Sequence, residues 1–128
     1  MPHIVVAGKL HVAGLVLLDQ AAGFSYDYVP DAEPNAYLAA LPRAEGLVLR
    51  TQPLRDVDIA AAPQLRIVSR HGVGYDAVDT AALAAREIPL AIVGDVNSRT
   101  VAEHTMMLLL AASRRLVKSA VALRSGDW

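Results

Sequence analysis

The sequence predicts an α/β fold, in which helices cover both faces of a sheet of parallel strands. The first observation is that short apolar runs alternate along the chain with Ala-rich helical stretches. The second is that these runs, such as residues 46–49, are continuous and do not alternate with polar residues. Strands that are buried on both faces have this composition, and helical crossovers join them in parallel sheets.

Each element can be placed by its residues. Strands are expected at residues 3–7, 24–29, 46–49, 65–69 and 90–93. Helices are expected after the first strand to about residue 22, and over residues 34–41, 57–62, 79–86 and about 101–124. Pro34 suits the first turn of its helix, where a missing N–H costs little. Because right-handed crossovers place helices on both faces, the five strands predict a doubly wound, flavodoxin-like sheet.

Length and composition limit the possible classes of protein. The 128 residues suffice for one domain with a core and are too few for two full domains. The apolar fraction of 54% and the charged fraction of 20% indicate a compact fold. The net charge of −1, with both signs dispersed, provides no basic surface for nucleic acid or anionic lipid. The absence of cysteine excludes disulfides, thiolate metal sites and a cysteine nucleophile.

The sequence also bears on targeting. No charged region precedes the first apolar run, so the start of the chain does not predict a signal peptide. The longest apolar run, residues 106–112, is far shorter than the roughly 20 residues of a membrane span. We therefore expect a cytoplasmic location and no membrane partner.

The expected last helix contains the most apolar part of the chain. Thr100 and Glu103 have the spacing of a capping box, in which each side chain accepts a hydrogen bond from the other residue's backbone N–H. Residues 106–112 are apolar on every side, and such a helix must be buried all round. Three parts could cover this helix: a second domain absent from this chain, a partner subunit, or the remainder of this domain.

The strongest local motif is Arg-His-Gly-Val-Gly-Tyr-Asp at residues 70–76, between an expected strand and an expected helix. Ligands of open α/β sheets bind beyond the carboxyl ends of strands, where glycines let backbone N–H groups approach an anion. A tight turn without a ligand is the simpler alternative. A dinucleotide fingerprint is a third, because residues 72–77 fit G-x-G-x-x-A and Asp95 follows the next strand. We disfavour it, because only one further strand follows and Asp79-Thr80 resembles a fresh helix cap.

Three motifs in order carry a resemblance to a known family. They are residues 70–79 (RHGVGYDAVD), Ile88-Pro89 and residues 100–105 (TVAEHT), supported by residues 47–51 (LVLRT) and 124–128 (RSGDW). From about residue 46 onward, the chain resembles the D-isomer-specific 2-hydroxy-acid dehydrogenases, which include phosphoglycerate dehydrogenases and glyoxylate or hydroxypyruvate reductases. The first forty residues resemble them only in pattern. The resemblance implies an oxidoreductase that acts on the CH–OH group of D-2-hydroxy acids, or on 2-keto acids, with NAD or NADP.

The resemblance also implies roles for five residues. The backbone N–H groups of Gly72, Val73 and Gly74 would bind the substrate carboxylate, and Val73 would lie beside the nicotinamide. Arg50 matches an arginine that faces the acidic groups of the substrate, and a guanidinium can bind a carboxylate through two parallel hydrogen bonds. Thr100 matches a position that contacts the cofactor from the substrate side.

The match lacks the residues that perform the reaction. Hydride transfer needs a nicotinamide, a cation that orients the keto acid and a general acid. The family takes its catalytic arginine, acidic partner, catalytic histidine and phosphate-binding glycines from a segment beyond residue 128. Glu103 is assigned to capping, and none of the histidines matches the catalytic one: His3, His11, His71 and His104. We therefore expect no catalytic residue in this chain, no activity of the chain alone and no tight dinucleotide binding.

We expect residues 1–100 to form a substrate-binding domain and residues 101–128 to begin the connection to a dinucleotide-binding domain absent from this chain. The expected partners are a small 2-hydroxy or 2-keto acid and a second copy, in a homodimer. No metal is expected, because the neighbouring acidic residues Asp27, Asp31 and Glu33 indicate a solvated loop. The alternative function is a catalytically incomplete module of the same fold that binds carboxylates or another protein.

Overall fold

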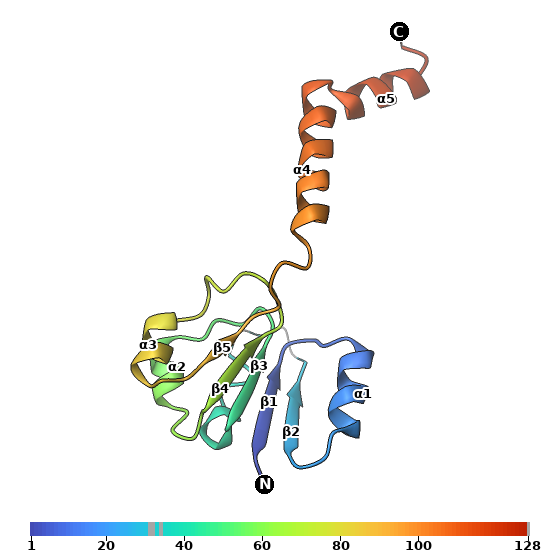
Figure 1. The fold of residues 1–128 in the computed structure, drawn as a ribbon. Helices are drawn as coiled ribbons and strands as arrows, with labels where there is room; N and C mark the ends of the chain where they lie inside the picture. The colour runs from blue at the N-terminus through green and yellow to red at the C-terminus, as the bar shows by residue number, and fades with distance from the viewer. Residues whose placement is uncertain (31–32, 34, 128) are drawn as a thin grey trace. The chain divides into compact units, whose positions relative to one another are not determined.

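The computed structural model describes residues 1–30, 33 and 35–127, so Asp31, Ala32, Pro34 and Trp128 lie outside the described residues. Contacts divide the chain into two compact units, residues 1–94 and the residues from 95 onward. The first unit contains all the described strands, and the second contains two helices (Figure 1).

The first unit is built on a sheet of five parallel strands: β1 (His3–Ala7), β2 (Ser25–Val29), β3 (Gly46–Leu49), β4 (Ile67–Arg70) and β5 (Leu90–Ala91). Their spatial order is β2-β1-β3-β4-β5 (Figure 1). The predicted parallel sheet and its flavodoxin-like order are therefore confirmed. The register pairs Val5 with Leu47 and Leu47 with Val68, so these side chains form one apolar row across the sheet.

Short helices connect the strands. α1 (Val12–Gln20) follows β1, α2 (Asp56–Ala60) follows β3, and α3 (Thr80–Ala85) follows β4. Because β2 and β3 lie on opposite sides of β1, right-handed crossovers place α1 on one face and both α2 and α3 on the other. Asp79 caps α3, since its Oδ1 accepts from the N–H of Ala82 at 2.9 Å. The predicted fresh helix start at this position is confirmed.

The predicted helix over residues 34–41, whose first residue is not described, is wrong. Residues 35–40 form turns, and a 3₁₀ helix follows over Leu41–Arg43. Backbone hydrogen bonds in these turns and the 3₁₀ helix join residues three apart, at 2.9 to 3.4 Å. Pro42 has no N–H to donate to the residue four before it, so an α-helical ladder cannot continue through it.

The core lies between the sheet and the helices α2 and α3, which cover one of its faces. Its largest side chains are less than 2% exposed and come from strands, helices and the segment before β3. One of them is Tyr37, whose hydroxyl donates to the carbonyl of Pro53 at 2.5 Å. Burial raises the pKa of this phenol. The other members of the core include Val5, Leu41, Leu47, Leu49, Leu54, Ile59, Val68 and Leu83.

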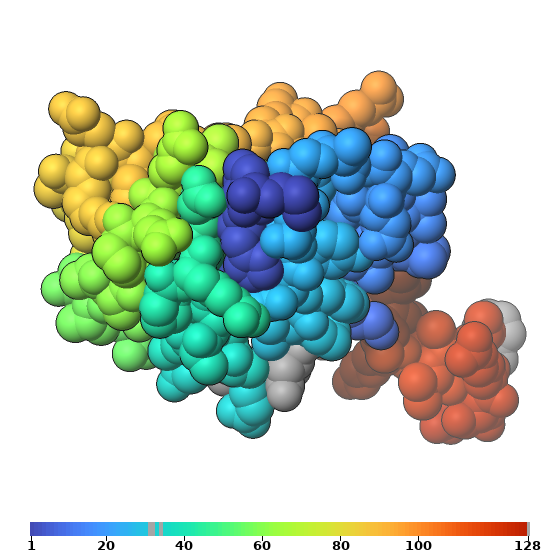
Figure 2. Space-filling model, turned by 90° about the horizontal axis from the view of Figure 1, so that it is seen from below, coloured from blue at the N-terminus to red at the C-terminus, as the bar shows by residue number. Residues whose placement is uncertain are grey.

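The amino-terminal ends of the strands form a separate surface. Figure 2 shows the dark blue start of the chain beside the green segments that precede β3 and β4. A hollow of about 310 Å³ there is lined by Pro2, Ile4, Glu45, Gly46, Arg66, Ile67 and Pro89. Because open α/β sheets bind ligands at the carboxyl ends of strands, we do not place the site here.

The second unit consists of α4 (Ser98–Ser113) and α5 (Leu116–Arg124), so the predicted single helix over residues 101–124 is wrong. The backbone turns at Arg115, which has a φ of 50° in the left-handed region. Its N–H donates to Ala112, three residues back, at 3.0 Å. Neither Gly nor Pro occurs at this break, so the sequence contains no signal for it.

The predicted capping box of Thr100 and Glu103 is also wrong. α4 begins at Ser98 after the N-cap residue Asn97, and Thr100 therefore lies inside the first turn. The Glu103 carboxylate instead accepts from Nε of Arg99 at 3.0 Å, across one turn of the exposed helix. This pair stabilises an α4 that starts earlier than the capping pattern indicates.

The apolar side chains of α4 and α5 are exposed, and neither helix has a buried residue. In the described part of the chain, no helix is both long and apolar enough to span a membrane. More than half of the surface of these side chains is accessible: Val101, Met106, Met107, Leu108, Leu109, Leu110, Leu116, Val117, Val121 and Leu123.

Candidate functional site

The carboxyl ends of β1, β3 and β4 form one edge of the sheet. The ladder of hydrogen bonds continues one residue beyond the strands: the N–H of Arg50 donates to Ala7 at 3.0 Å, and the N–H of His71 donates to Leu49 at 2.8 Å. Arg50 and His71 are therefore neighbours, and Arg50 also adjoins Gly8 at the end of β1. Ligands of open α/β sheets bind at this edge.

Gly8 and Gln52 fit together beside Arg50. Gly8 has a φ of +92°, and a Cβ at this position would lie 2.7 Å from Oε1 of Gln52 and 2.9 Å from Cβ of Arg50. The Gln52 side chain is buried, and its Oε1 accepts from the N–H of Thr51 at 3.0 Å. Gln52 therefore fixes the turn that carries Arg50. The sequence analysis missed both residues, although a glycine directly after an apolar strand was a usable signal for Gly8.

Arg50 carries an available positive charge. It is exposed, and its guanidinium has no hydrogen bond or ion pair with any described residue. An arginine in this state can form two parallel hydrogen bonds to a carboxylate or phosphate without first losing a partner. This is the behaviour expected of a substrate-binding residue.

The glycine loop after β4 supplies backbone donors. The N–H of Gly72 donates to Arg70 at 2.9 Å, whereas the N–H groups of Val73 and Gly74 have no acceptor among the described residues. Gly72 and Val73 are half-buried and Gly74 is exposed. Of the three predicted donors, two are therefore free to bind an anion.

The far end of the loop is attached to the chain that follows β3. Leu54 and Val78 form an isolated parallel bridge. The N–H of Leu54 donates to Ala77 at 2.9 Å, and the N–H of Asp79 donates to Leu54 at 2.8 Å. The loop is therefore held at its end by the same segment that contains Arg50 at its start.

The geometry after β4 does not fit a dinucleotide fingerprint. In such a fingerprint, a helix begins at the glycines, so that its N-terminus faces the pyrophosphate. Here α3 begins at Thr80, six residues after Gly74, and Asp79 caps it. The described residues therefore offer no pyrophosphate site at this loop.

Thr100, the other residue predicted to contact the cofactor, lies in the second unit. It is exposed and occupies the first turn of α4. The structure brings Arg50 and the glycine loop together at one edge of the first unit. The role of Thr100 stays a prediction.

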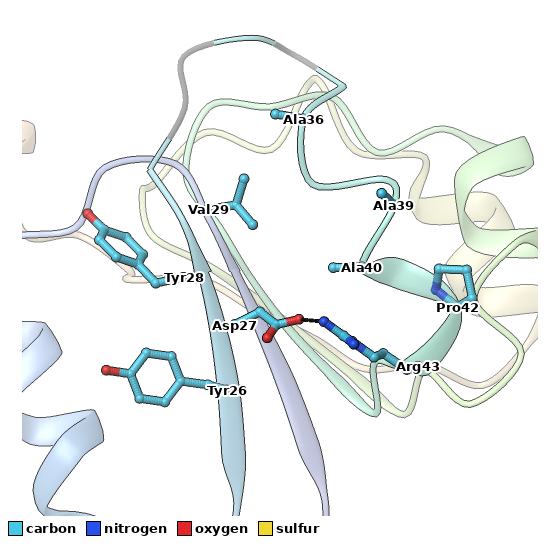
Figure 3. Close-up of a pocket in the computed structure, with 9 residues that line it drawn as sticks. All are labelled: Tyr26, Asp27, Tyr28, Val29, Ala36, Ala39, Ala40, Pro42 and Arg43. Carbon is cyan, nitrogen blue, oxygen red and sulfur yellow. Dashed lines mark hydrogen bonds and ion pairs between the residues drawn. The ribbon is translucent and has the colours of Figure 1, made fainter.

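A larger hollow, of about 570 Å³, lies along β2 (Figure 3). Its lining is mostly alanine, valine and tyrosine, and its two charged side chains, Asp27 and Arg43, pair with each other (Figure 3). A ligand would therefore meet no unpaired charge there. For this reason, we place the candidate site at the carboxyl edge of the sheet and not in the hollow along β2.

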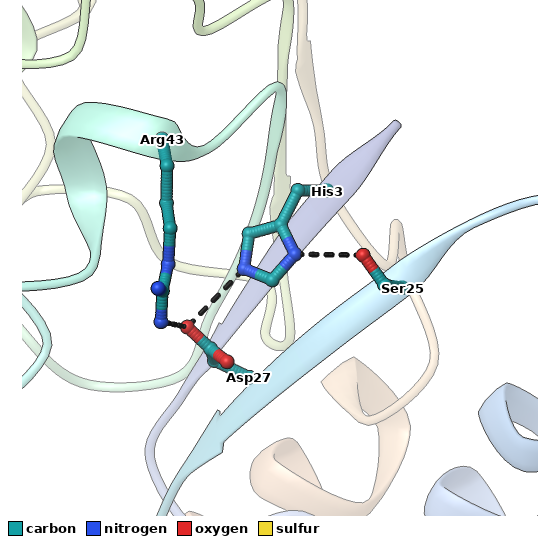
Figure 4. A network of polar contacts seen from close by, with 4 residues as sticks. All are labelled: His3, Ser25, Asp27 and Arg43. Carbon is teal, nitrogen blue, oxygen red and sulfur yellow. Dashed lines mark hydrogen bonds and ion pairs between the residues drawn. The ribbon is translucent and has the colours of Figure 1, made fainter. Parts of the chain in front are cut away.

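Asp27 belongs to a polar network (Figure 4). Nδ1 of His3 lies 2.8 Å from Oγ of Ser25, and Nε2 of His3 lies 3.2 Å from Oδ2 of Asp27. Arg43 donates to the same oxygen, and its guanidinium holds the pKa of the Asp27 carboxyl below its ordinary value. The network joins β1, β2 and the 3₁₀ helix.

The prediction of a solvated acidic loop is therefore wrong for Asp27, which is on a strand. Asp31 lies outside the described residues, and Glu33 is exposed. No group of three side chains that could hold a metal ion occurs in the part of the chain that the structure describes.

Comparison with protein families identifies the chain's relatives. Residues 4–124 match the model of the D-isomer specific 2-hydroxyacid dehydrogenase catalytic domain. The chain belongs to this family. The family resemblance of the sequence motifs is thereby confirmed, and the match extends to the first forty residues, which resembled the family only in pattern.

Individual members of the 2-hydroxyacid dehydrogenase family show how much of a longer protein this chain represents. The chain is 36% identical to a D-3-phosphoglycerate dehydrogenase of Mycobacterium leprae over 100% of its own length and 24% of that protein. It is 34% identical to glyoxylate/hydroxypyruvate reductase B of Escherichia fergusonii, over 99% of the chain and 40% of the reductase.

A solved member of the family has the same fold. It is the NADPH-dependent glyoxylate/hydroxypyruvate reductase of Sinorhizobium meliloti in complex with citrate, with 32% identity and a TM-score of 0.77. The similarity covers 100% of this chain and 40% of the reductase. The chain therefore corresponds to less than half of the length of each of these relatives.

Proposed function

We propose that this chain is the substrate-binding portion of an NAD(P)-dependent oxidoreductase that interconverts D-2-hydroxy acids and 2-keto acids. The observation that carries the proposal is the free guanidinium of Arg50 at the same sheet edge as the free N–H groups of Val73 and Gly74. A cation and two backbone donors can bind and orient one carboxylate. Family membership supports the assignment.

Two residues of this chain would contact the cofactor, but the described residues do not form its binding site. When bound, NAD or NADP supplies or accepts the hydride. Val73 would border the nicotinamide, and Thr100 would contact the cofactor from the substrate side. Because no helix begins at the glycines, the described residues cannot hold the pyrophosphate in the usual way. We therefore propose no catalytic residue in this chain and no turnover by the chain alone.

The domain division belongs to this proposal. Residues 1–100 form the substrate-binding domain, and residues 101–128 begin the connection to the dinucleotide-binding domain of a longer cytoplasmic enzyme. Sequencing the gene beyond the codon for residue 128 tests this. A G-x-G-x-x-G unit followed by Arg, Glu and His supports it, and an immediate stop codon contradicts it.

Substrate binding can be measured on the 128-residue chain. We expect calorimetric titration with glyoxylate to show weak binding, and Arg50→Ala to weaken it by about tenfold or more, since a charge-assisted hydrogen bond contributes about 1.5–3 kcal/mol. Arg66→Ala is the matched control, because Arg66 is an exposed arginine before β4, at the opposite end of that strand from the loop. No heat with the unaltered chain, or equal loss in both variants, would contradict the proposed site.

A carboxylate-binding module without a reaction is the second candidate. It is favoured by the anion-binding edge, whose cation and backbone donors all lie in the first unit. Binding of glyoxylate together with a stop codon after residue 128 would support this candidate. NADH oxidation by the pure chain with glyoxylate or hydroxypyruvate would refute both candidates, because both assume that the chain alone has no turnover.

We also propose that α4 and α5 form a homodimer interface. Exposed apolar surface on a protein can mark an interaction site, and both helices expose many large apolar side chains. Leu109→Glu should convert a sedimenting dimer to a monomer. Val57→Glu, on the exposed surface of α2, is the control that should leave the dimer intact. A monomer at high concentration of the unaltered chain would refute the interface.

A further inference from the structure

Arg70, the last residue of β4, joins the end of β3 to the start of the glycine loop. Its Nη1 lies 3.4 Å from the carbonyl oxygen of Leu49 and 3.3 Å from that of His71, and donates to both. The side chain is half-buried. The guanidinium is therefore held between two fixed backbone groups and is not directed freely into solvent.

The guanidinium also lies against Gly72. A Cβ at Gly72 would lie 3.2 Å from Nη1, 3.3 Å from Cζ and 3.5 Å from Nη2 of Arg70. These three distances are nearly equal, so the plane of the guanidinium faces the position that a Cβ at Gly72 would occupy. Any larger side chain at Gly72 would have to displace the arginine. Gly74 shows no such restriction, because its Cβ would only reach ordinary contact with Asp76, at 3.5 Å.

No carboxylate neutralises Arg70 among the residues that the structure describes. Three other arginines pair with a carboxylate: Arg43, Arg66 and Arg99. Arg70 donates its hydrogen bonds to carbonyl oxygens instead, so no negative charge offsets its positive charge beside the loop. A fixed charge next to free backbone N–H groups favours the binding of an anion.

We propose that Arg70 is a positioning residue of the anion-binding loop. Its guanidinium links the carbonyl of Leu49, at the end of β3, to that of His71 and limits the space beside Gly72, and so keeps the N–H groups of Val73 and Gly74 in place for a carboxylate. It acts through the backbone and through its charge, and not by contact with the ligand. This inference rests on the proposed function of the loop, and Arg50 remains the residue that binds the anion directly.

Lysine cannot replace arginine in this role. The guanidinium is planar and presents several donors in a fixed geometry, whereas an ammonium is a compact charge on a flexible stem. Lysine at position 70 would retain the charge without the flat contact with Gly72. Comparing Arg70→Lys with Arg70→Gln therefore separates the geometric contribution from the contribution of charge.

The first test uses amide NMR spectra of the ligand-free 128-residue chain. In Arg70→Gln and Arg70→Lys, we expect the resonances of Val73 and Gly74 to shift and their backbone ¹⁵N order parameters to fall, because the loop is then held less firmly. Arg66→Gln, which removes the same charge before the other end of β4, should leave them unchanged. Unchanged Val73 and Gly74 amides in both Arg70 variants would overturn the inference, whether or not the loop binds a ligand.

The second test is a glyoxylate titration of the same proteins, followed at these amides. Arg70→Gln should weaken binding about tenfold and Arg70→Lys by an intermediate factor, while Arg66→Gln stays within about twofold of the unaltered chain. Equal affinity of Arg70→Lys and the unaltered chain would overturn the geometric role. Absence of binding by the unaltered chain would refute the proposed function instead, and the amide shifts and order parameters of the first test would still decide on Arg70.

Gly72→Ala approaches the same contact from the other side. The added methyl group forces the guanidinium to move by a few tenths of an ångström, and Arg70 itself is retained. We expect amide shifts of the same direction as in Arg70→Gln, with an unchanged far-UV circular dichroism spectrum. If Gly72→Ala leaves the Arg70 side-chain resonances and the loop amides in place, the packing on which the inference depends is absent.

Discussion

Two regions of this chain are rich in apolar residues, and only one of them has a core. In the first unit, Val5, Leu49 and Leu83 are at most 2% exposed, whereas Leu109 and Val117 of the second unit are 59% and 77% exposed. The first unit places its apolar side chains on one row of strands and the facing sides of short helices. In the second unit, residues 106–112 of α4 are apolar on every side, and two helices cannot cover each other on every side. Apolar composition therefore creates a core only where the geometry supplies opposing surfaces.

The largest expected difference between the units is the effect of removing a leucine side chain. Leu49→Ala should lower the free energy of unfolding by about 2–5 kcal/mol, because it leaves a cavity in a closed core. Leu109→Ala, an identical change on the exposed surface of α4, should change it by less than about 0.5 kcal/mol. Urea unfolding at low protein concentration measures both. Similar losses would show that α4 belongs to the same core as the sheet.

Helix caps provide the next comparison. Asp79→Ala should cost about 1 kcal/mol, because it removes the carboxylate that accepts from the N–H of Ala82. Asn97→Ala, at the cap of α4, should have little effect, since the Asn97 side chain makes no capping hydrogen bond. Thermal unfolding followed by circular dichroism distinguishes them. A larger loss for Asn97→Ala would reverse the contrast between the units.

At the break between α4 and α5, we expect one substitution to increase stability and its neighbour to decrease it. Arg115→Gly should stabilise the second unit by up to about 1 kcal/mol, because glycine adopts a positive φ without the steric cost of a side chain. Arg114→Gly is the control, with a φ of −94°, and should destabilise the helix end. Helical ellipticity during heating reports both changes. Loss of stability in Arg115→Gly would indicate a continuous helix instead of the break.

The smallest expected effect concerns Asp27 in the first unit. Arg43 and, to a lesser extent, His3 lower the pKa of the Asp27 carboxyl, while burial opposes them. A folded pKa below the unfolded value stabilises the protein above the ordinary pKa of about 3.9, and this contribution is lost as the pH falls through the folded pKa.

Asp27→Asn should therefore reduce the free energy of unfolding by less than about 1 kcal/mol at neutral pH, because both partners are partly exposed. The difference from the unaltered chain should shrink as the pH falls through the folded pKa of Asp27 and vanish below it. Urea titrations at several pH values measure it. A difference that grows toward low pH would have the opposite sign to that expected from the ion pair.

The sequence predicted the features that depend on local pattern. Continuous apolar runs identified most of the strands, and the helical stretches between them indicated a parallel sheet. The cap at Asp79 and the glycine loop were also recognisable, because each depends on a residue type with one dominant conformational property. Pro42 would only have ended a helix at Leu41, so no local signal in the sequence opposed the helix over residues 34–41.

Other features depend on contacts that no local pattern records. Gln52 is buried only because Gly8, more than forty positions away, leaves space for it. Arg70 becomes a structural partner of Gly72 only when Leu49 offers its carbonyl oxygen. The turn at Arg115 has no sequence signal at all, since arginine rarely adopts a positive φ. Such residues can be found only after the chain is folded.

The bridge between Leu54 and Val78 has a consequence for affinity. Together with Arg70 at the other end, it fixes a loop of about six residues at both of its ends. The conformational entropy of ordering the loop is then lost during folding and not on encounter with a ligand. A weakly held carboxylate would meet donors that are already in place. In a longer enzyme, such preorganisation would leave the free energy of binding available for orienting the reacting carbon.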